Sequence, residues 1–238
     1  MSDNDTSTSS ESDTGSDDYP DHLPKPPFFM VISGARGSGK TTLEINLLYN
    51  ELAGRFVKIY MFSSTFKVDP AYKVIQIPPE QVFDDYNDAT VRKILKDAME
   101  DGHEEEDKPP ILIIFDDVVG SANFKKSITT NGTNALSLLA LRGRHYNISC
   151  IVLTQCVRGI SPEVRSNTDC AIVFSTTNEK ELEAIFESYG FGKKKTWMKL
   201  FTSITSTPRG FYMIHLTSQD WNHKVFNNFT PIKIKHTY

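Results

Sequence analysis

FFMVISGARGSGKTTLEINLLYNEL, residues 28–52, is the stretch that decides the fold. It begins with an apolar run typical of a buried strand, passes through a glycine-rich turn, and ends in a segment whose leucines recur at helical spacing. Gly34, Gly39, Lys40 and Thr41 match the phosphate-loop pattern G-x-x-x-x-G-K-[ST]. A strand, a glycine-rich loop and a helix in this order predict that the loop binds phosphate groups.

Each part of this loop has a predicted role. Glycines at positions 34, 37 and 39 let the backbone turn tightly, so that its N–H groups point at phosphate oxygens. Lys40 is predicted to reach the β- and γ-phosphates of ATP, and the Thr41 hydroxyl to bind Mg²⁺. The residues predicted to bind the nucleotide are Gly34, Ala35, Arg36, Gly37, Ser38, Gly39, Lys40, Thr41 and Thr42.

A second apolar run, ILIIFDD at residues 111–117, ends in two acids. Ligands of open α/β sheets gather at the carboxyl ends of strands, which is where Asp116 and Asp117 would lie. This is the Walker B pattern, in which Asp116 would hold Mg²⁺ through water and Asp117 would act as the general base. The structural alternative is an Asp-Asp turn after a core strand.

The third signal is ISCIVLT at residues 148–154, an apolar strand followed by Gln155. A polar pair at the end of the strand after Walker B is the sensor position of one large branch of NTPases. Gln155 would then hydrogen-bond the γ-phosphate or the attacking water, which with Lys40 and Asp117 completes the predicted catalytic set. A polar strand end without such a role is the alternative.

The rest of the chain alternates strand and helix patterns, which predicts an α/β fold with a mainly parallel sheet flanked by helices. Further strands are predicted at 55–64, 74–77, 170–174 and 211–216, and a last extended piece at 231–235. Helices are predicted at 89–99, 134–144, 161–167 and 178–189, and polar loops at 121–132 and 193–195.

Charge divides the chain unevenly. Residues 1–27 contain seven acids and one lysine, and their Ser/Thr/Asp-rich composition predicts a disordered acidic tail. Residues 28–238 are predicted to form a single domain. Its C-terminal part, 190–238, has eight Lys or Arg residues against Asp220 alone. This basic part is compatible with a polyanionic partner, and a merely solvated surface is equally compatible.

The cysteines and the hydropathy limit the setting. The three cysteines, Cys150, Cys156 and Cys170, are an odd set in apolar surroundings, which favours reduced thiols inside a cell and gives no zinc-site spacing. No apolar run approaches the ~20 residues of a membrane span, and the acidic N-terminus is not typical of a signal peptide. We therefore expect no membrane partner.

The order GARGSGKTT, ILIIFDD, RGRHYNISCIVLTQ and PEVRSNTDCAIVF resembles that of the poxvirus-type genome-packaging ATPases of large DNA viruses and virophages. This family is a viral branch of the FtsK/HerA superfamily, and the resemblance covers roughly residues 28–190. It implies a RecA/FtsK-like P-loop NTPase fold with the sensor strand between the Walker A and Walker B strands. It also implies a homo-oligomeric ring that pumps double-stranded DNA into a preformed capsid, with contacts to capsid vertex proteins. The implied location is intracellular, in the host cytoplasm or virus factory, with virion association as a further expectation.

The family roles transfer to matching residues. Lys40 and Thr41 would bind phosphate and Mg²⁺, Asp116 would bind Mg²⁺ through water, Asp117 would activate water and Gln155 would be the sensor. Many relatives have Glu as the second acid, so Asp117 is one methylene shorter. Ring ATPases also use an arginine finger from a neighbouring subunit. The candidates are Arg142, Arg144 and Arg165, any of which could instead be structural, and Arg36 could contribute in cis.

Two other functions remain open at this stage. A small-molecule kinase would use the same phosphate loop, although the sequence has no clear arginine-rich lid. A nucleotide-gated capsid assembly module would bind ATP with negligible turnover. For the leading hypothesis, an ATP-hydrolysing DNA translocase, the loops to examine for DNA contacts are Lys193–Lys195 and Lys125-Lys126, and a merely solvated role is the alternative for both.

Overall fold

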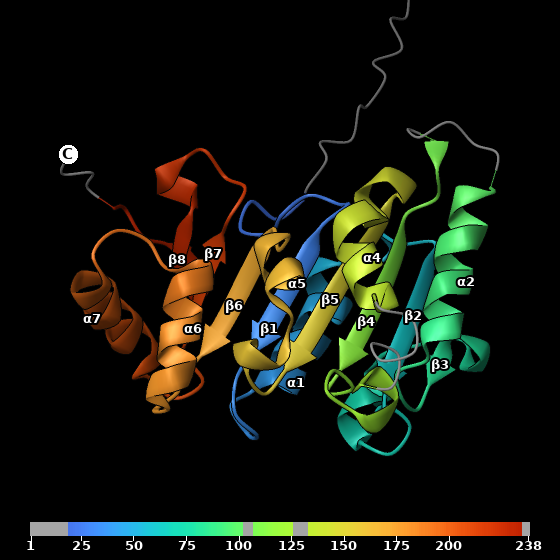
Figure 1. The fold of residues 1–238 in the computed structure, drawn as a ribbon, viewed down its shortest axis with the longest axis horizontal. Coiled ribbons are helices and arrows are strands. Elements are labelled where there is room, and N and C mark those ends of the chain that lie inside the picture. The colour runs from blue at the N-terminus through green and yellow to red at the C-terminus, as the bar shows by residue number, and fades with distance from the viewer. Residues whose placement is uncertain (1–18, 102–106, 126–132, 235–238) are drawn as a thin grey trace, which may run out of the picture.

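The computed structural model describes residues 19–101, 107–125 and 133–234, and within them nine strands form one sheet (Figure 1). The strands are β1 (Phe29–Ser33), β2 (Lys58–Ser63), β3 (Val82–Phe83), β4 (Ile111–Asp116), β5 (Ile148–Thr154), β6 (Cys170–Phe174), β7 (Phe211–His215), β8 (Val225–Asn227) and β9 (Thr230–Pro231). Their order across the sheet is β3-β2-β4-β5-β1-β6-β7-β8-β9.

The sheet has a parallel part and an antiparallel part. Strands β3 to β6 in this order are mutually parallel, whereas β7, β8 and β9 each pair antiparallel to the preceding neighbour. Strand β5 lies between β4 and β1, as the family resemblance implies. In Figure 1 the arrowheads of β4, β5 and β6 point to the bottom of the view, so the loops after them share one edge.

Helices cover both faces of the sheet. In Figure 1, α2, α4, α5 and α6 lie in front of it and α1 lies behind it. The α-helices are α1 (Lys40–Asn46), α2 (Asp88–Met99), α4 (Ala135–Arg142), α5 (Pro162–Ser166), α6 (Glu179–Tyr189) and α7 (Lys194–Thr205). A π-helical turn, Leu47–Glu51, continues α1, and 3-10 turns lie at Pro70–Val74, Pro79–Gln81, Gly143–Tyr146, Val157–Gly159 and Trp221–His223. None of the helices in the described part of the chain is long and apolar enough to cross a membrane.

The buried strands supply side chains to two faces in alternation. In β1, Val31 belongs to the core under α2 and α4, whereas Met30 and Ile32 belong to the core that includes the leucines of α1. A third cluster lies beneath α6 and α7, with Trp197 and Phe201 among its members. Strands buried on both faces explain why the sequence of the parallel part reads as continuous apolar runs.

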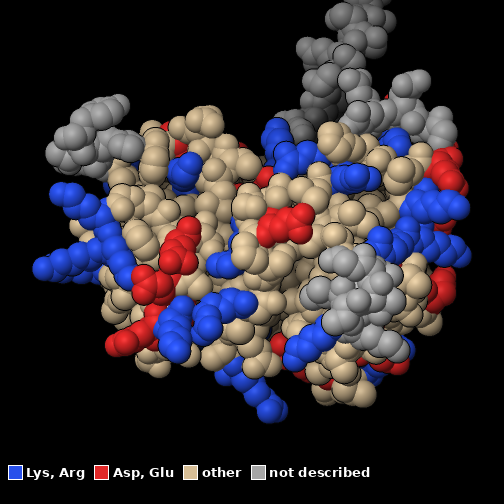
Figure 2. Space-filling model, viewed as in Figure 1, with Lys and Arg blue, Asp and Glu red and all other residues tan. Residues whose placement is uncertain are grey.

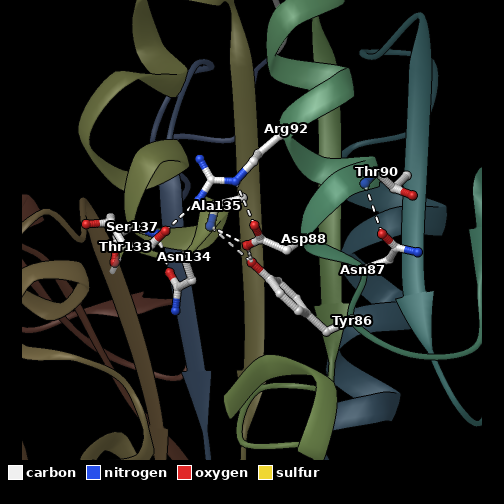
Figure 3. A network of polar contacts seen from close by, with 9 residues as sticks. All are labelled: Tyr86, Asn87, Asp88, Thr90, Arg92, Thr133, Asn134, Ala135 and Ser137. Atoms are coloured by element: carbon white, nitrogen blue, oxygen red, sulfur yellow. Dashed lines mark hydrogen bonds and ion pairs between the residues drawn. The ribbon is translucent and has the colours of Figure 1, made fainter. Parts of the chain in front are cut away.

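A polar network joins the starts of α2 and α4, the helix that leads into β5 (Figure 3). The Oδ1 atom of Asp88 accepts hydrogen bonds from the Tyr86 hydroxyl at 2.7 Å and from the backbone N–H of Ala135 at 2.8 Å. Arg92 donates to Asp88 Oδ2 at 2.6 Å and to the carbonyl of Thr133 at 2.5 Å. These bonds satisfy an N–H at the first turn of α4 and fix the direction in which that helix returns to the sheet.

Two predicted elements, the strand at 74–77 and the loop at 193–195, were wrong. Residues 74–77 form no strand; Pro70–Val74 is a 3-10 turn, and the third parallel strand is the short Val82–Phe83 instead. The loop predicted at 193–195 is the beginning of α7, for which Lys193 is the N-cap. Apolar Trp197 and Phe201 on one face hold this helix against the sheet, which outweighs the charge of the three lysines.

The boundary of the predicted tail also differs. Residues 1–18 lie outside the described part of the chain, but residues 19–27 do not form a tail. Leu23 is 4% exposed and packs in the core that includes α1, and the carbonyl of His22 accepts a hydrogen bond from His215. Burial of Leu23 offsets part of the conformational entropy that residues 19–27 lose on becoming ordered. The prediction from polar composition did not include this burial.

In the predicted loop at 121–132, residues 122–125 are helical and residues 126–132 lie outside the described part. Short strands β8 and β9 replace the single extended piece predicted at 231–235. The remaining strand and helix predictions agree with the structure to within a few residues at their ends.

Candidate nucleotide-binding and hydrolysis site

The phosphate loop connects β1 to α1, and its shape depends on its glycines. Gly37 has φ +77° and Gly39 has φ +110°, a region of backbone conformation that strains other residues. A side chain at Gly34 would place its Cβ 2.6 Å from Ser38 Oγ and 2.8 Å from the Cβ of Phe174. The loop therefore turns back on itself at a distance that only glycine permits.

Lys40, the first residue of α1, is buried inside this loop. Its Nζ donates hydrogen bonds to the carbonyl oxygens of Gly34 at 2.7 Å and Ala35 at 3.2 Å. Burial lowers the pKa of Lys40, and the charges of Asp117 and Asp116 act in the opposite direction. The ammonium group thus lies between the phosphate loop and the two acids.

The other predicted loop residues differ in how exposed their side chains are. Arg36 and Thr42 are exposed, and Thr41 is half-buried in the first turn of α1. The hydroxyl of Ser38 is buried and has no hydrogen-bond partner among the residues that the structure describes. A buried hydroxyl without a partner beside a glycine-rich loop suits a phosphate oxygen as its acceptor.

Asp116 ends β4 and is 5% exposed. Its Oδ2 atom accepts hydrogen bonds from the hydroxyls of Ser63 at 2.8 Å, Thr65 at 3.1 Å and Tyr72 at 3.1 Å. Ser63 is the register partner of Asp116 on neighbouring β2. All three hydroxyls contact the same carboxylate oxygen, so they fix the orientation of the side chain and leave Oδ1 for another ligand.

A second carboxyl group lies behind Asp116. Glu44 of α1 is fully buried, and its Oε2 accepts a 2.6 Å hydrogen bond from the Tyr72 hydroxyl. Burial raises the pKa of Glu44 well above its ordinary value, the charge of Asp116 raises it further, and the bond from Tyr72 opposes both. The environment therefore favours the protonated form of Glu44, which adds no charge beside Asp116.

Asp117 and Gln155, which the sequence placed after two different strands, are hydrogen-bonded to each other. Gln155 Nε2 donates to Asp117 Oδ2 at 2.8 Å, and both side chains are exposed. The backbone N–H of Asp117 bonds the carbonyl of Leu153 at 3.3 Å, and its φ is +55°. This left-handed turn carries Asp117 away from the direction of Asp116, so the two acids face different surroundings.

The residues present fit Mg²⁺ and a nucleoside triphosphate. The loop offers backbone N–H groups, the buried Lys40 ammonium and the unpartnered Ser38 hydroxyl to phosphate oxygens. The Thr41 hydroxyl and the free oxygen of Asp116 are oxygen ligands of the kind that Mg²⁺ prefers.

Sequence reasoning missed the four residues behind Asp116. Ser63 and Thr65 had a usable signal, since a run of hydroxyl residues follows the apolar part of β2. Glu44 had one as well, because an acid among the leucines of an apolar helix face requires a partner. Tyr72 had none, since it approaches Asp116 only through the packing of the 3-10 turn Pro70–Val74 against α1.

The arginine-finger candidates lie away from the site of their own chain. Arg142 ends α4 and Arg144 follows in the 3-10 turn before β5, so both lie at the edge where the parallel strands begin. Arg165 of α5 donates to Ser188 Oγ at 2.8 Å, and its Nε is buried. Arg165 is thus engaged in the contact between α5 and α6, whereas Arg142 and Arg144 are exposed.

The family model described as the poxvirus A32 protein matches residues 18–219. The uncharacterized protein 075L of Invertebrate iridescent virus 6 is 24% identical over 191 residues, covering 77% of this chain and 69% of the relative. The uncharacterized protein 088R of Invertebrate iridescent virus 3 is 24% identical over 210 residues, covering 87% and 77%.

Solved structures resemble the fold. The genome packaging NTPase B204 from Sulfolobus turreted icosahedral virus 2, in complex with sulfate, superposes with a TM-score of 0.62 at 20% identity, covering 82% of this chain and 95% of that chain. The same NTPase in complex with AMP gives a TM-score of 0.58 at 19% identity, covering 83% and 96%. The fold is therefore that of a P-loop NTPase, and the match over residues 18–219 shows that the chain belongs to the poxvirus A32 protein family.

Proposed function

We propose that this chain hydrolyses ATP to translocate double-stranded DNA into a viral capsid. The observation that carries the proposal is the hydrogen bond between Gln155 and Asp117 beside a complete phosphate loop. It joins a predicted sensor to a predicted general base. Family membership supports the same reading, as does the likeness to B204, which is described as a genome packaging NTPase and has been solved with ATP-gammaS.

The residues of the chain divide the reaction among them. The loop amides and Lys40 bind the phosphate chain. Thr41 and Asp116 would hold Mg²⁺, whose charge would offset that of the phosphate oxygens. Asp117 takes the proton of the attacking water, and Gln155 holds that water or the Asp117 carboxylate in position. Ser63, Thr65 and Tyr72 hold Asp116 in one orientation, and Glu44 accepts a hydrogen bond from Tyr72.

The proposal includes a ring of identical subunits and contacts to capsid vertex proteins, inside the infected cell and with the virion. Arg142 and Arg144 lie at the opposite edge of the sheet from the phosphate loop. They can therefore serve only the site of a neighbouring subunit. This favours them over Arg165, which is already bonded to Ser188.

DNA would be gripped through phosphate contacts that ignore sequence and weaken with salt. Figure 2 shows Lys and Arg side chains gathered at the edge that α7 forms in Figure 1, beside the acids of α6. Of these, Lys194 pairs with Glu183 at 2.5 Å, whereas Lys193, Lys195 and Lys199 are exposed. Lys125 is also exposed, and Lys126 lies outside the described residues.

The test is steady-state ATP hydrolysis with and without double-stranded DNA. We expect DNA to raise the turnover of the wild type. Lys40→Ala and Asp117→Asn should both lower it, the second by about 10²- to 10⁴-fold, because it removes the general base. Asp97→Asn on the exposed face of α2 is the matched control and should leave turnover unchanged.

Other outcomes point to the alternatives. Turnover that ignores DNA but requires a small phosphate acceptor would favour the kinase. Tight ATP binding without turnover, together with an Asp117→Asn variant that packages DNA normally, would favour the assembly module.

A further inference from the structure

A cleft of about 420 Å³ lies beside the phosphate loop, on the side away from the catalytic acids. One wall is the loop itself, residues 35–38, and the opposite wall is the turn between α7 and β7, residues 205–210. Phe174 and Ser175, at the end of β6, lie between the walls. The volume falls within the range of small-molecule sites in proteins.

The order of the strands sets the direction in which a nucleotide would lie. From β1, the sheet continues on one side through β5 and β4, whose ends carry Gln155, Asp116 and Asp117. On the other side it continues through β6 and β7, which border the cleft. A phosphate chain whose last phosphate faces the acids must therefore continue away from them, toward the cleft.

Arg209 stands at the rim of this cleft. Its Cβ and Cγ atoms lie 3.7 and 3.6 Å from the position that a Cβ on Gly39 would occupy, so its side chain begins directly beside the phosphate loop. Its side chain is exposed, and within residues 19–101, 107–125 and 133–234 no acid forms an ion pair with it. A cation held beside a cleft without a partner is available to a ligand.

The backbone of the turn holds Arg209 in place. Arg209 has φ +60°, a conformation that is uncommon for a residue with a long side chain. The next residue is Gly210, where an added Cβ would lie 2.2 Å from Thr207 Oγ1 and 2.7 Å from the carbonyl of Ile204. A residue larger than glycine at position 210 would collide with these atoms, so the turn requires glycine there.

We infer that this cleft receives the ribose and base of ATP, and that Arg209 is a positioning residue whose guanidinium covers the face of the base. This inference rests on the ATPase proposed above. Guanidinium groups stack on aromatic faces, and Phe174 and Pro208 supply apolar surface in the same cleft. The hydroxyls of Ser175 and Thr207 line it as well, within reach of polar atoms on a nucleoside.

The test compares two ligands by calorimetric titration in the presence of Mg²⁺. ADP has phosphates, a ribose and a base, whereas inorganic tripolyphosphate has only phosphates. The variant is Arg209→Asn, because Asn tolerates the left-handed backbone and removes the guanidinium without a new strain. Lys93→Asn, with the same loss of charge on the exposed face of α2 and outside the cleft, is the control.

We expect Arg209→Asn to weaken ADP binding by about 3- to 30-fold, the range of a cation stacked on an aromatic face, and to leave tripolyphosphate binding within about 2-fold. The control should bind both ligands as the wild type does. Unchanged ADP binding would overturn the inference. An equal loss for both ligands would overturn it too, because Arg209 would then serve the phosphates.

A second variant tests the cleft independently of Arg209. Ser175→Phe would fill the space between the two walls, and it should weaken ADP binding while tripolyphosphate still binds. ADP affinity equal to the wild type in Ser175→Phe would exclude the cleft as the nucleoside site. If the wild-type protein binds ADP no more tightly than tripolyphosphate, the phosphate loop alone binds the ligand. That result would also overturn the inference, because the cleft would contribute nothing to affinity. A wild-type protein that binds neither ligand contradicts the proposed ATPase itself.

Discussion

The parallel part of the sheet, from β3 to β6, and the antiparallel part, from β7 to β9, place their polar groups differently. The parallel strands end together at one edge, so residues far apart in sequence, such as Ser63, Asp116 and Gln155, meet there without any special loop. The antiparallel strands have alternating directions and no such common edge. Their contribution to the site comes from a single turn, residues 205–210.

This difference suggests a separation of tasks. The parallel part holds every residue proposed to act on the terminal phosphate. The antiparallel part, with α7, supplies one wall of the cleft inferred to hold the nucleoside. Changes in the two parts should therefore separate hydrolysis from nucleoside binding.

The largest effect is expected from Trp197→Ala in α7. Trp197 is 1% exposed, stacks on Phe201 with ring centroids 5.0 Å apart, and meets the ring of Tyr212 edge-on at 5.8 Å. Its removal should lower the free energy of unfolding by about 3–5 kcal/mol, measured by urea denaturation. The cluster beneath α7 includes side chains of β6, so we expect the whole domain to unfold in one transition.

The control for this change is Trp221→Ala, whose side chain is only half-buried and should matter much less. Two separate unfolding transitions in Trp197→Ala would contradict the expectation of a single transition. They would show that the antiparallel part unfolds as a unit of its own and is not merely an extension of the parallel sheet.

A smaller effect is expected from Tyr72→Phe, which removes the hydroxyl shared by Glu44 and Asp116. Loss of a group that orients a metal ligand typically weakens metal binding by about 10- to 100-fold. The Mg²⁺ concentration that gives half-maximal hydrolysis should therefore rise by about 10-fold or more. Tyr60→Phe on β2 is the matched control. A Tyr72→Phe variant with an unchanged Mg²⁺ requirement would show that the hydroxyls serve stability alone.

The smallest effect concerns His215 of β7, whose Nε2 donates to the carbonyl of His22 at 2.9 Å. Burial lowers the pKa of His215, and nearby His22 and His223 lower it further against the opposing bond to the His22 carbonyl. The folded protein therefore holds this ring neutral, while the unfolded chain takes up a proton near the ordinary value of 6.5. The stabilisation is complete above that value and is lost as pH falls through the lowered pKa.

We expect the difference in unfolding free energy between wild type and His215→Gln to shrink as pH falls below 6.5, by about 1 kcal/mol at most. Urea denaturation at several pH values measures it. Gln219→Asn, at an exposed neutral side chain beyond the end of β7, is the control and should give a difference that does not change with pH. A pH-independent difference for His215→Gln would mean that the folded and unfolded chains protonate this ring alike, so that burial does not keep it neutral.

The parallel part could be predicted from sequence because its signals are local. Continuous apolar runs gave β1, β4 and β5, and the glycine and acid patterns at their ends gave the phosphate loop and the paired acids. The strand order that brings Asp117 beside Gln155 came from the family resemblance and not from a local signal. These features do not depend on how distant helices pack.

The antiparallel part and the support of Asp116 were harder to predict because their signals are not local. Three consecutive lysines concealed the start of α7, although Trp197 and Phe201 show helical spacing. Strands β8 and β9 are too short to have a pattern of their own and exist through pairing with β7. Tyr72 reaches Asp116 from the 3-10 turn Pro70–Val74. The sequence predicted no such turn, only a strand at 74–77.

The left-handed backbone at Asp117 has a consequence for which residues this position can accept. Asp and Asn adopt this conformation with little strain, whereas a longer side chain or a β-branched one is disfavoured there. Asp117→Glu, which keeps the acid but lengthens the side chain by one methylene, should therefore distort the turn. Asp117→Asn keeps the backbone and the contact with Gln155. It should therefore give a subunit that binds ATP without hydrolysing it, which would allow the nucleotide-bound state of the ring proposed above to be isolated.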